Sequence, residues 1–278
     1  MLHSQSADCQ DRFTFGANWT QFLKRLTPQR IEIAKQSLAG MLEESSLMGR
    51  RFLDVGCGSG LFSLAARELG AKVHSFDYDP QSVGCTLELK HLFRPDDADW
   101  TIGQGSALDE NYMRALGQFD IVYSWGVLHH TGDMWRALDL VKIPCTSGGK
   151  LFIAIYNDQG GISQAWRLIK HGYNRVPAML RFPYLLAVAI PFEGILFAVW
   201  VVRGRPLDYI RSWTEYSTSS LRGMSRWTDL VDWIGGYPFE VAKPEQIFDF
   251  FRARGFLLQR MTTCGGGLGC NEYVFRNA

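Results

Sequence analysis

The stretch 51–80 constrains the fold of this chain more than any other part of the sequence. An apolar run at 52–55 is followed by a glycine-rich turn at 56–60. A second apolar run, 61–69, ends at a glycine, and a third, 72–76, ends at Asp77. We therefore predict a strand, a tight turn, a helix and a second strand. This is the first half of a nucleotide-binding βαβ unit.

The glycines of the turn predict a backbone that binds a ligand. A chain that passes from strand to helix in so few residues needs positive φ angles, which glycine adopts at little cost. Without Cβ atoms, a ligand can lie against the main chain, where the helix N-terminus presents unpaired N–H groups. Asp77 stands where such folds place the acid that accepts ribose hydroxyl groups. Asp54 would repel a pyrophosphate, so we expect it either to pair with a cationic ligand or to orient the glycine turn.

The run Asp54-Val55-Gly56-Cys57-Gly58-Ser59-Gly60 resembles the first motif of class I S-adenosylmethionine-dependent methyltransferases. The resemblance implies a Rossmann-like α/β fold with a seven-stranded, mostly parallel sheet, an antiparallel last strand and helices on both faces. It also implies S-adenosylmethionine as the cofactor and S-adenosylhomocysteine as the product. The cofactor-binding residues that we predict are Asp54, Gly56, Cys57, Gly58, Gly60, Asp77, Tyr78, Gly105, Ser106, Ala107, Ser124 and Trp125.

Two of these positions have alternatives. Many relatives carry an acid at the position of Ser106 that binds the adenine amino group, so here a hydroxyl or a backbone carbonyl has to replace it. Tyr78 follows the ribose acid and is placed to stack on the adenine, or else it is an exposed loop tyrosine.

The segment 118–125 predicts the fourth strand, and a histidine pair follows it. Ligands of open α/β sheets bind beyond the carboxyl ends of the strands. His129 and His130 are therefore the catalytic candidates, because an imidazole suits proton removal from a nucleophile near neutral pH. Alternatively, one of them caps the next helix or binds the cofactor carboxylate. We predict no metal site, since no third ligand follows at a recognisable spacing.

The predicted substrate side combines polar groups after the fifth strand, expected at 150–155, with aromatic residues elsewhere in the chain. Packing and turn chemistry are the alternatives for these positions. Asn18 joins two of the aromatic residues in an N-terminal lid. The substrate-binding candidates are Phe15, Trp19, Tyr156, Asn157, Gln159 and Tyr237.

The segment 182–202 is almost wholly apolar and long enough to raise a transmembrane assignment. We expect Pro183 and Pro191 to break it, and Glu193 would be costly in lipid. In order of preference, we expect a buried helical pair that covers the substrate or forms a homodimer, a contact with a membrane surface between flanking arginines, and a true span. The predicted domains are an N-terminal helical lid, a methyltransferase domain in two segments and a helical insertion: 1–48, 49–161 with 236–278, and 162–235.

Composition limits the partners and the location. With 29 Lys and Arg against 28 Asp and Glu among 278 residues, the net charge of +1 gives no electrostatic reason to expect nucleic acid. Six scattered cysteines and a polar start predict a reduced, cytoplasmic protein, with a peripheral membrane contact as the variant. Cys264 and Cys270 are expected to be loop cysteines without a role, or else a metal-binding or cross-linked pair.

The glycine motif together with 127–130 resembles small-molecule and quinone-type O-methyltransferases. We therefore expect methyl transfer to a small or amphipathic organic acceptor, foremost to an oxygen atom, with nitrogen, sulfur or carbon as alternatives. A non-catalytic protein that binds S-adenosylmethionine as a scaffold stays open. An NAD(P) oxidoreductase is disfavoured because Leu61 replaces a residue of the dinucleotide pattern.

Overall fold

The computed structural model of the chain describes residues 13, 23, 26–214, 216 and 226–278. Contacts divide the chain into two compact units. The smaller one comprises Met1–Phe13 and Gln164–Pro238, and the larger one comprises Thr14–Ser163 and Phe239–Ala278. The segment 28–48, which we expected to belong to a separate lid, falls in the larger unit. Each unit is described by itself below.

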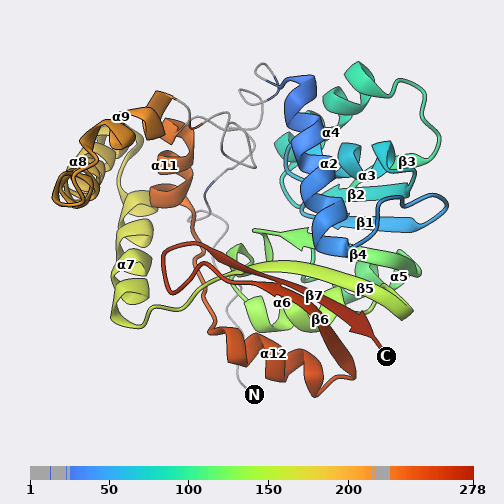
Figure 1. Ribbon diagram of the computed structural model, residues 1–278. Coiled ribbons are helices and arrows are strands. Elements are labelled where there is room, and N and C mark those ends of the chain that lie inside the picture. The colour runs from blue at the N-terminus through green and yellow to red at the C-terminus, as the bar shows by residue number, and fades with distance from the viewer. Residues whose placement is uncertain (1–12, 14–22, 24–25, 215, 217–225) are drawn as a thin grey trace. The chain divides into compact units, whose positions relative to one another are not determined.

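The larger unit is built on a seven-stranded sheet with the order β3-β2-β1-β4-β5-β7-β6. Its strands are β1 (Arg51–Val55), β2 (Lys72–Asp77), β3 (Trp100–Gln104), β4 (Phe119–Trp125), β5 (Cys145–Tyr156), β6 (Phe256–Thr262) and β7 (Cys270–Asn277). Neighbouring strands from β3 to β5 are parallel, and β7 is antiparallel to both of its neighbours (Figure 1). The predicted Rossmann-like sheet with an antiparallel last strand is confirmed.

Helices cover both faces of this sheet, because its central strands are buried on both sides. On β1, Asp54 points toward α3 and accepts a hydrogen bond from Ser63, whereas Leu53 and Val55 face the opposite side and join its apolar core. The first face carries α2 (Pro28–Leu42), α3 (Leu61–Glu68) and α4 (Pro80–Phe93), and the second carries α5 (Glu110–Ala115), α6 (Met134–Val141) and α12 (Pro244–Arg252). The alternation along β1 therefore fixes the layer in which each helix packs.

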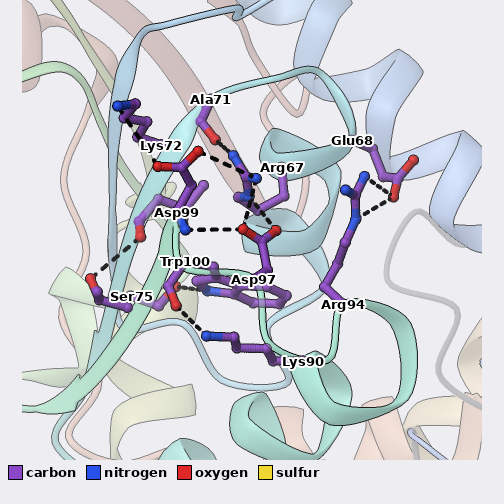
Figure 2. A network of polar contacts seen from close by, with 12 residues as sticks. Arg67, Glu68, Ala71, Lys72, Ser75, Lys90, Arg94, Asp97, Asp99 and Trp100 are labelled. Atoms are coloured by element: carbon purple, nitrogen blue, oxygen red, sulfur yellow. Dashed lines mark hydrogen bonds and ion pairs between the residues drawn. The ribbon is translucent and has the colours of Figure 1, made fainter.

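A polar network ties α3 and α4 to the edge strand β3 and its neighbour β2 (Figure 2). The Arg67 guanidinium binds both carboxylate oxygens of Asp97, with N···O distances of 2.8 and 2.9 Å. The Lys90 ammonium donates to the carbonyl of Trp100 over 2.6 Å, and the Trp100 indole N–H donates to the Ser75 hydroxyl over 2.9 Å. Bidentate Arg–carboxylate pairs of this kind fix geometry well, so the network holds the β2–β3 edge in register.

The described part of the smaller unit consists of helices. They are α7 (Gly161–Arg175), whose first residues belong to the larger unit, α8 (Ala178–Val202), α9 (Pro206–Thr214) and α11 (Arg226–Gly235). The expectation that Pro183 and Pro191 break the apolar segment was wrong, because α8 continues through both. Each proline removes one main-chain donor, and packing holds the helix across the gap: Leu185 and Ala189 are buried, and the Tyr184 hydroxyl donates to a carbonyl of α7 over 2.9 Å.

Among the described residues, α8 is the one helix whose 25-residue length and apolar composition would let it cross a membrane. The core helix of a soluble protein can be equally long and apolar, but only 11% of the 18-residue apolar stretch of α8 is buried. Within the described part of the chain, α8 is therefore mostly exposed and not buried as we expected.

The packing of α12 against the sheet yields a stability prediction. Phe251 is fully buried, and its ring centroid lies 4.7 Å from that of Phe275 and 5.6 Å from that of Phe256. We expect Phe251→Ala to lower the free energy of unfolding by about 3–5 kcal/mol in denaturant titrations, since a buried cavity replaces the ring. Leu257→Ala, at a side chain that is 49% exposed, is the control and should cost less than about 1 kcal/mol. Equal losses in the two variants would contradict this packing.

Candidate functional site

The turn after β1 requires glycine for two reasons at once. Gly56 and Gly60 have φ angles of 78° and 79°, and Gly60 is also the N-cap of α3. A Cβ atom at Gly56 would lie 2.4 Å from Cγ1 of Val127, and one at Gly60 would lie 2.8 Å from Cγ2 of Thr86. We predicted that the missing Cβ atoms make room for a ligand. At these two positions the room is instead taken by side chains of the protein itself.

Main-chain hydrogen bonds hold the turn against β2. The N–H groups of Gly56 and Cys57 both donate to the carbonyl of Phe76, over 2.8 and 3.0 Å. The Thr86 hydroxyl can donate to either of two acceptors, the carbonyl of Gly58 and the sulfur of Cys57, and each lies 3.2 Å away. Burial raises the pKa of the Cys57 thiol well above its usual value. Cys57 therefore stays a neutral thiol inside the turn.

Asp77, at the end of β2, faces the turn with an oriented carboxylate. The Gly58 N–H donates to one carboxylate oxygen over 3.0 Å, and the Asp79 N–H donates to the other over 2.9 Å. Each oxygen has a further lone pair for a ligand hydroxyl. Burial raises the pKa of Asp77 to about 6, against the effect of the two backbone donors. This geometry fits the predicted role of a ribose acceptor.

Asp54 lies beneath the turn, where a chain of donors reaches it. The Trp100 indole is a donor only, so the Ser75 hydroxyl that accepts from it can donate to Ser63 at 2.6 Å, and Ser63 donates to Asp54 at 2.5 Å. Burial raises the pKa of Asp54 to about 7. Of the two predicted roles, these contacts match the orientation of the glycine turn. A direct contact of Asp54 with a ligand stays a prediction.

The segment after β3 lies beside Asp77. The Gly105 N–H donates to the Asp77 carbonyl over 3.0 Å, and the Ser106 hydroxyl accepts from the Leu108 N–H over 3.2 Å. Ala107 is buried in the apolar core. Tyr78 is 49% exposed, and its backbone carbonyl accepts from the Gln104 side chain over 3.1 Å. The half-exposed Tyr78 is compatible with the predicted stacking on adenine, whereas the Ser106 hydroxyl bonds within its own turn.

The end of β4 is held from both sides. The buried Ser124 hydroxyl donates to the carbonyl of Val55 over 3.0 Å and so joins β4 to β1. The Trp125 indole N–H donates to the Glu272 carboxylate on β7 over 2.6 Å. The register explains this bond, since Ala154 pairs with Trp125 on one side and with Glu272 on the other. Cofactor contacts of Ser124 and Trp125 stay predictions.

The two catalytic candidates lie in the short 3₁₀ helix η2 (Leu128–His130) after β4, and their surroundings differ. His129 is fully buried, and its Nδ1 accepts a hydrogen bond from the Tyr156 N–H over 3.3 Å. Because Nδ1 carries the lone pair, the proton of this imidazole resides on Nε2, so His129 has no basic nitrogen left to offer. The half-buried His130 ring stands edge-on to Tyr156, with 5.4 Å between centroids. His130 is therefore the better placed of the two to act as a base.

The structure uses the other substrate candidates of the larger unit to hold the β6–β7 loop. The Asn157 side-chain oxygen accepts from Asn271 over 3.1 Å, and the Gln159 side-chain amide donates to the Gly266 carbonyl over 2.6 Å. Tyr156 instead presents its ring to His129, at 3.8 Å, and to Phe239, at 5.3 Å. A role of Asn157, Gln159 or Tyr156 toward a substrate stays a prediction.

The remaining expectations concern residues outside this cluster. Tyr237 belongs to the smaller unit, where its ring lies 5.0 Å from that of His171. Phe15, Asn18 and Trp19 lie outside the described residues. In the described part of the chain, no group of three or more His, Cys, Asp or Glu side chains is arranged to hold a metal ion. Cys264 and Cys270 are not joined in a disulfide.

Sequence reasoning missed the residues that support the site from distant segments. They are Thr86 and Val127, which pack on the glycines, Gln104 beneath Tyr78, and Glu272 at Trp125. Val127 belongs to the run 127–130 that carried a family resemblance, but that run gave no sign of its contact with Gly56. Thr86, Gln104 and Glu272 belong to no motif that we identified.

Comparisons with known proteins agree with this geometry. A family model described as a methyltransferase domain matches residues 18–184, which is more than half of the chain. Among curated proteins, the ubiquinone biosynthesis O-methyltransferases of Xanthomonas euvesicatoria pv. vesicatoria and Bordetella avium are 30% and 31% identical to it over 135 residues. That segment is 49% of this chain and 52% of each relative, so the chain spans about half the length of the curated relatives it matches.

Among solved structures, the magnesium protoporphyrin IX methyltransferase of Synechocystis PCC 6803 with bound S-adenosylmethionine superposes with a TM-score of 0.55 at 12% identity. The superposition covers 99% of this chain and 100% of that one. An O-methyltransferase family protein from Burkholderia thailandensis gives a TM-score of 0.51 at 10% identity, over 95% of this chain and 58% of that one. At these identities the likeness concerns the fold alone.

The raised pKa of Asp54 predicts how stability depends on pH. Between its ordinary value near 3.8 and about 7, the folded protein binds a proton at Asp54 that the unfolded chain does not, so the free energy of unfolding falls as the pH rises through this window. Asp54→Asn removes this contribution. We expect its stability relative to the native protein to increase by up to about 4 kcal/mol from pH 4 to pH 7 in denaturant titrations. Asp99→Asn, at a carboxyl that is 50% exposed, is the control for the loss of one carboxylate. A parallel curve for Asp54→Asn would refute the assignment.

The Asp77 carboxylate predicts how cofactor affinity changes. Asp77→Ala removes the acceptor that faces the glycine turn, and we expect at least about tenfold weaker binding of S-adenosylhomocysteine by calorimetry, as for a lost charged hydrogen bond. For the native protein, affinity should rise with pH through about 6, because the ionised carboxylate is the better acceptor. Asp99→Ala is the matched control, because Asp99 precedes the first residue of β3, whereas Asp77 pairs with the last one. Unchanged affinity in Asp77→Ala would remove Asp77 from the site.

Proposed function

We propose a substrate class for this chain, which belongs to the class I S-adenosylmethionine-dependent methyltransferases and uses S-adenosylmethionine as its cofactor. The chain transfers the methyl group to an oxygen atom of a small or amphipathic organic acceptor. The observation that carries this proposal is that the half-buried His130 and the Tyr156 ring lie together at the carboxyl ends of β4 and β5, the sheet edge at which such folds bind ligands.

The glycine turn fits the cofactor by its chemistry. It ends at the N-terminus of α3, faces the oriented Asp77 carboxylate, and has the half-exposed Tyr78 beside it. Asp77 would hold the ribose hydroxyl groups and Tyr78 would cover the adenine. When bound, S-adenosylmethionine supplies a methyl group on a positively charged sulfur. Most of the acceleration then comes from holding the acceptor oxygen in line with that methyl group.

His130 supplies the proton chemistry that an oxygen acceptor needs. A hydroxyl group becomes a good nucleophile as it loses its proton, and the His130 imidazole would take that proton. Bound S-adenosylmethionine would supply the methyl group, whose bond to sulfur breaks as the bond to oxygen forms, and S-adenosylhomocysteine would leave. His129 has a different part: its neutral ring accepts from the Tyr156 N–H and holds Tyr156 beside His130. His129 is thus a positioning residue, and Tyr156 shapes the acceptor side.

The acceptor class follows from the surroundings of His130. The Tyr156 ring beside His130, and the Phe239 ring that packs on Tyr156, favour an aromatic or apolar molecule over a strongly charged one. The net charge of +1 offers no attraction to nucleic acid. The curated relatives carry the name of ubiquinone biosynthesis O-methyltransferases, which supports both an oxygen atom and an amphipathic acceptor. A cytoplasmic location is part of the proposal. Nitrogen, sulfur and carbon acceptors remain the alternatives, and a cofactor-binding scaffold would bind without turnover.

Turnover of alkylcatechols of increasing chain length, followed with methyl-labelled S-adenosylmethionine, tests the role of His130. We expect His130→Ala to lower kcat by about 10²–10⁴-fold near neutral pH, because a phenolic hydroxyl then has no acceptor for its proton. The deficit should shrink as the pH approaches 10, at which phenols ionise unaided.

His91→Ala, on the exposed surface of α4, is the matched control and should behave like the native enzyme. Unimpaired turnover in His130→Ala would exclude the histidine as the base. Tight cofactor binding with no methylated product from any acceptor would favour the scaffold.

A further inference from the structure

The helix α8 leaves apolar side chains exposed on nearly opposite sides. Ile190, Phe197 and Val201 follow one another at seven- and four-residue steps and form one stripe, with exposed fractions of 66%, 41% and 48%. Ile195, Val199 and Val202 form a second stripe, with exposed fractions of 65%, 40% and 88%. At 100° per residue the stripes lie about 150° apart around the helix axis. A single flat protein partner would cover one stripe, whereas lipid chains can surround both.

The acidic residue of α8 is turned toward the remainder of the smaller unit. The Glu193 carboxylate accepts from the Arg226 guanidinium over 2.7 Å and from the Tyr209 hydroxyl over 2.9 Å. The side chains of Glu193 and Arg226 are only 13% and 14% exposed. We expected Glu193 to make a contact of this segment with lipid costly. The ion pair removes that objection to a lipid contact, because a paired charge on the covered side does not enter the hydrocarbon.

The same ion pair excludes a span across the bilayer. It lies in the middle of α8 and connects that point to α9 and α11, which also carry Asp208, Arg211 and Asp229. If α8 crossed the membrane, these groups would be drawn to its centre, at a high cost for each charge. If α8 lies in the plane of the membrane, they remain on the water side. Interfacial helices ordinarily carry their own polar face, and here α9 and α11 supply it.

Charge and aromatic residues complete the pattern. Five arginines and two acidic residues occur between positions 175 and 213. One acid is Glu193, and the other, Asp208, is already shared between Arg205 and Arg211. Trp213 and Trp227 are 36% and 40% exposed, and indole rings favour the boundary between headgroups and hydrocarbon. An excess of arginine beside an apolar helix is complementary to anionic headgroups.

We propose that α8 is a membrane-surface site. It lies in the plane of an anionic phospholipid bilayer, with both apolar stripes among the acyl chains and the arginines at the phosphates. The site rests on the smaller unit alone, so it stands apart from the methyl-transfer reaction. It would bring the enzyme to the phase in which an amphipathic acceptor dissolves.

Co-sedimentation of the full chain with vesicles tests this site. The native protein should sediment with equimolar phosphatidylcholine and phosphatidylglycerol, and more weakly with phosphatidylcholine alone. The triple variant I190Q/I195Q/V202Q keeps good helix formers but removes apolar surface from both stripes, and we expect at least about tenfold weaker binding to both vesicles. R181Q/R203Q should bind the anionic vesicles about 20- to 30-fold more weakly, from about 1 kcal/mol per arginine, with little change on neutral ones.

Leu87→Gln, at a leucine that is 50% exposed on α4, is the matched control for the loss of apolar surface. Circular dichroism and calorimetry with S-adenosylhomocysteine verify that every variant is folded, and they keep a failure at the membrane distinct from a failure of the methyl-transfer site. The proposal is overturned if the native protein stays in the supernatant with both vesicles, or if folded I190Q/I195Q/V202Q sediments like the native protein. A native dimer that this variant dissociates, without sedimentation of either, would assign α8 to a second copy instead.

Discussion

The hydrogen bond from the Gly58 N–H to the Asp77 carboxylate is the contact on which the cofactor site depends. It joins the turn after β1 to the end of β2, so the position of the backbone donors and the position of the acid are fixed together. The parallel register of β1 and β2 places the two segments side by side. The carbonyl of Phe76, one residue earlier, accepts from two further amides of the same turn. The pairing of β1 with β2 thus holds the glycine turn and the Asp77 carboxylate in place together.

A buried line of hydroxyl groups supports this edge from below. Trp100, Ser75, Ser63 and Asp54 connect β3, β2, α3 and β1 in one direction of hydrogen-bond donation, and each of the four side chains is almost fully buried. Satisfied polar networks in a low-dielectric interior favour a single arrangement over its neighbours. The line therefore fixes how α3 is rotated, and with it the direction in which the first turn of α3 presents its amides.

Local sequence patterns predicted most of the fold, and long-range pairing explains what they missed. The fourth strand was predicted at 118–125 and runs over Phe119–Trp125, because a run of apolar and aromatic residues identifies a strand directly. The fifth strand was predicted too short, at 150–155: β5 already begins at Cys145 and includes Gly148 and Gly149, where its pairing with β4 changes register. The glycine motif gave the cofactor edge. It could not show that Asn157 and Gln159 contact a loop more than a hundred residues away, nor that packing holds α8 together across its prolines.

The contact between Val127 and the empty side of Gly56 has a consequence for how this motif can change. A larger residue at position 56 would collide with a side chain that belongs to the segment after β4, and trimming Val127 alone would still leave a backbone that side chains rarely adopt. Positions 56 and 127 therefore constrain each other's substitution. Redesign of the turn for a different nucleoside would have to change both the backbone at position 56 and the segment after β4 that carries Val127.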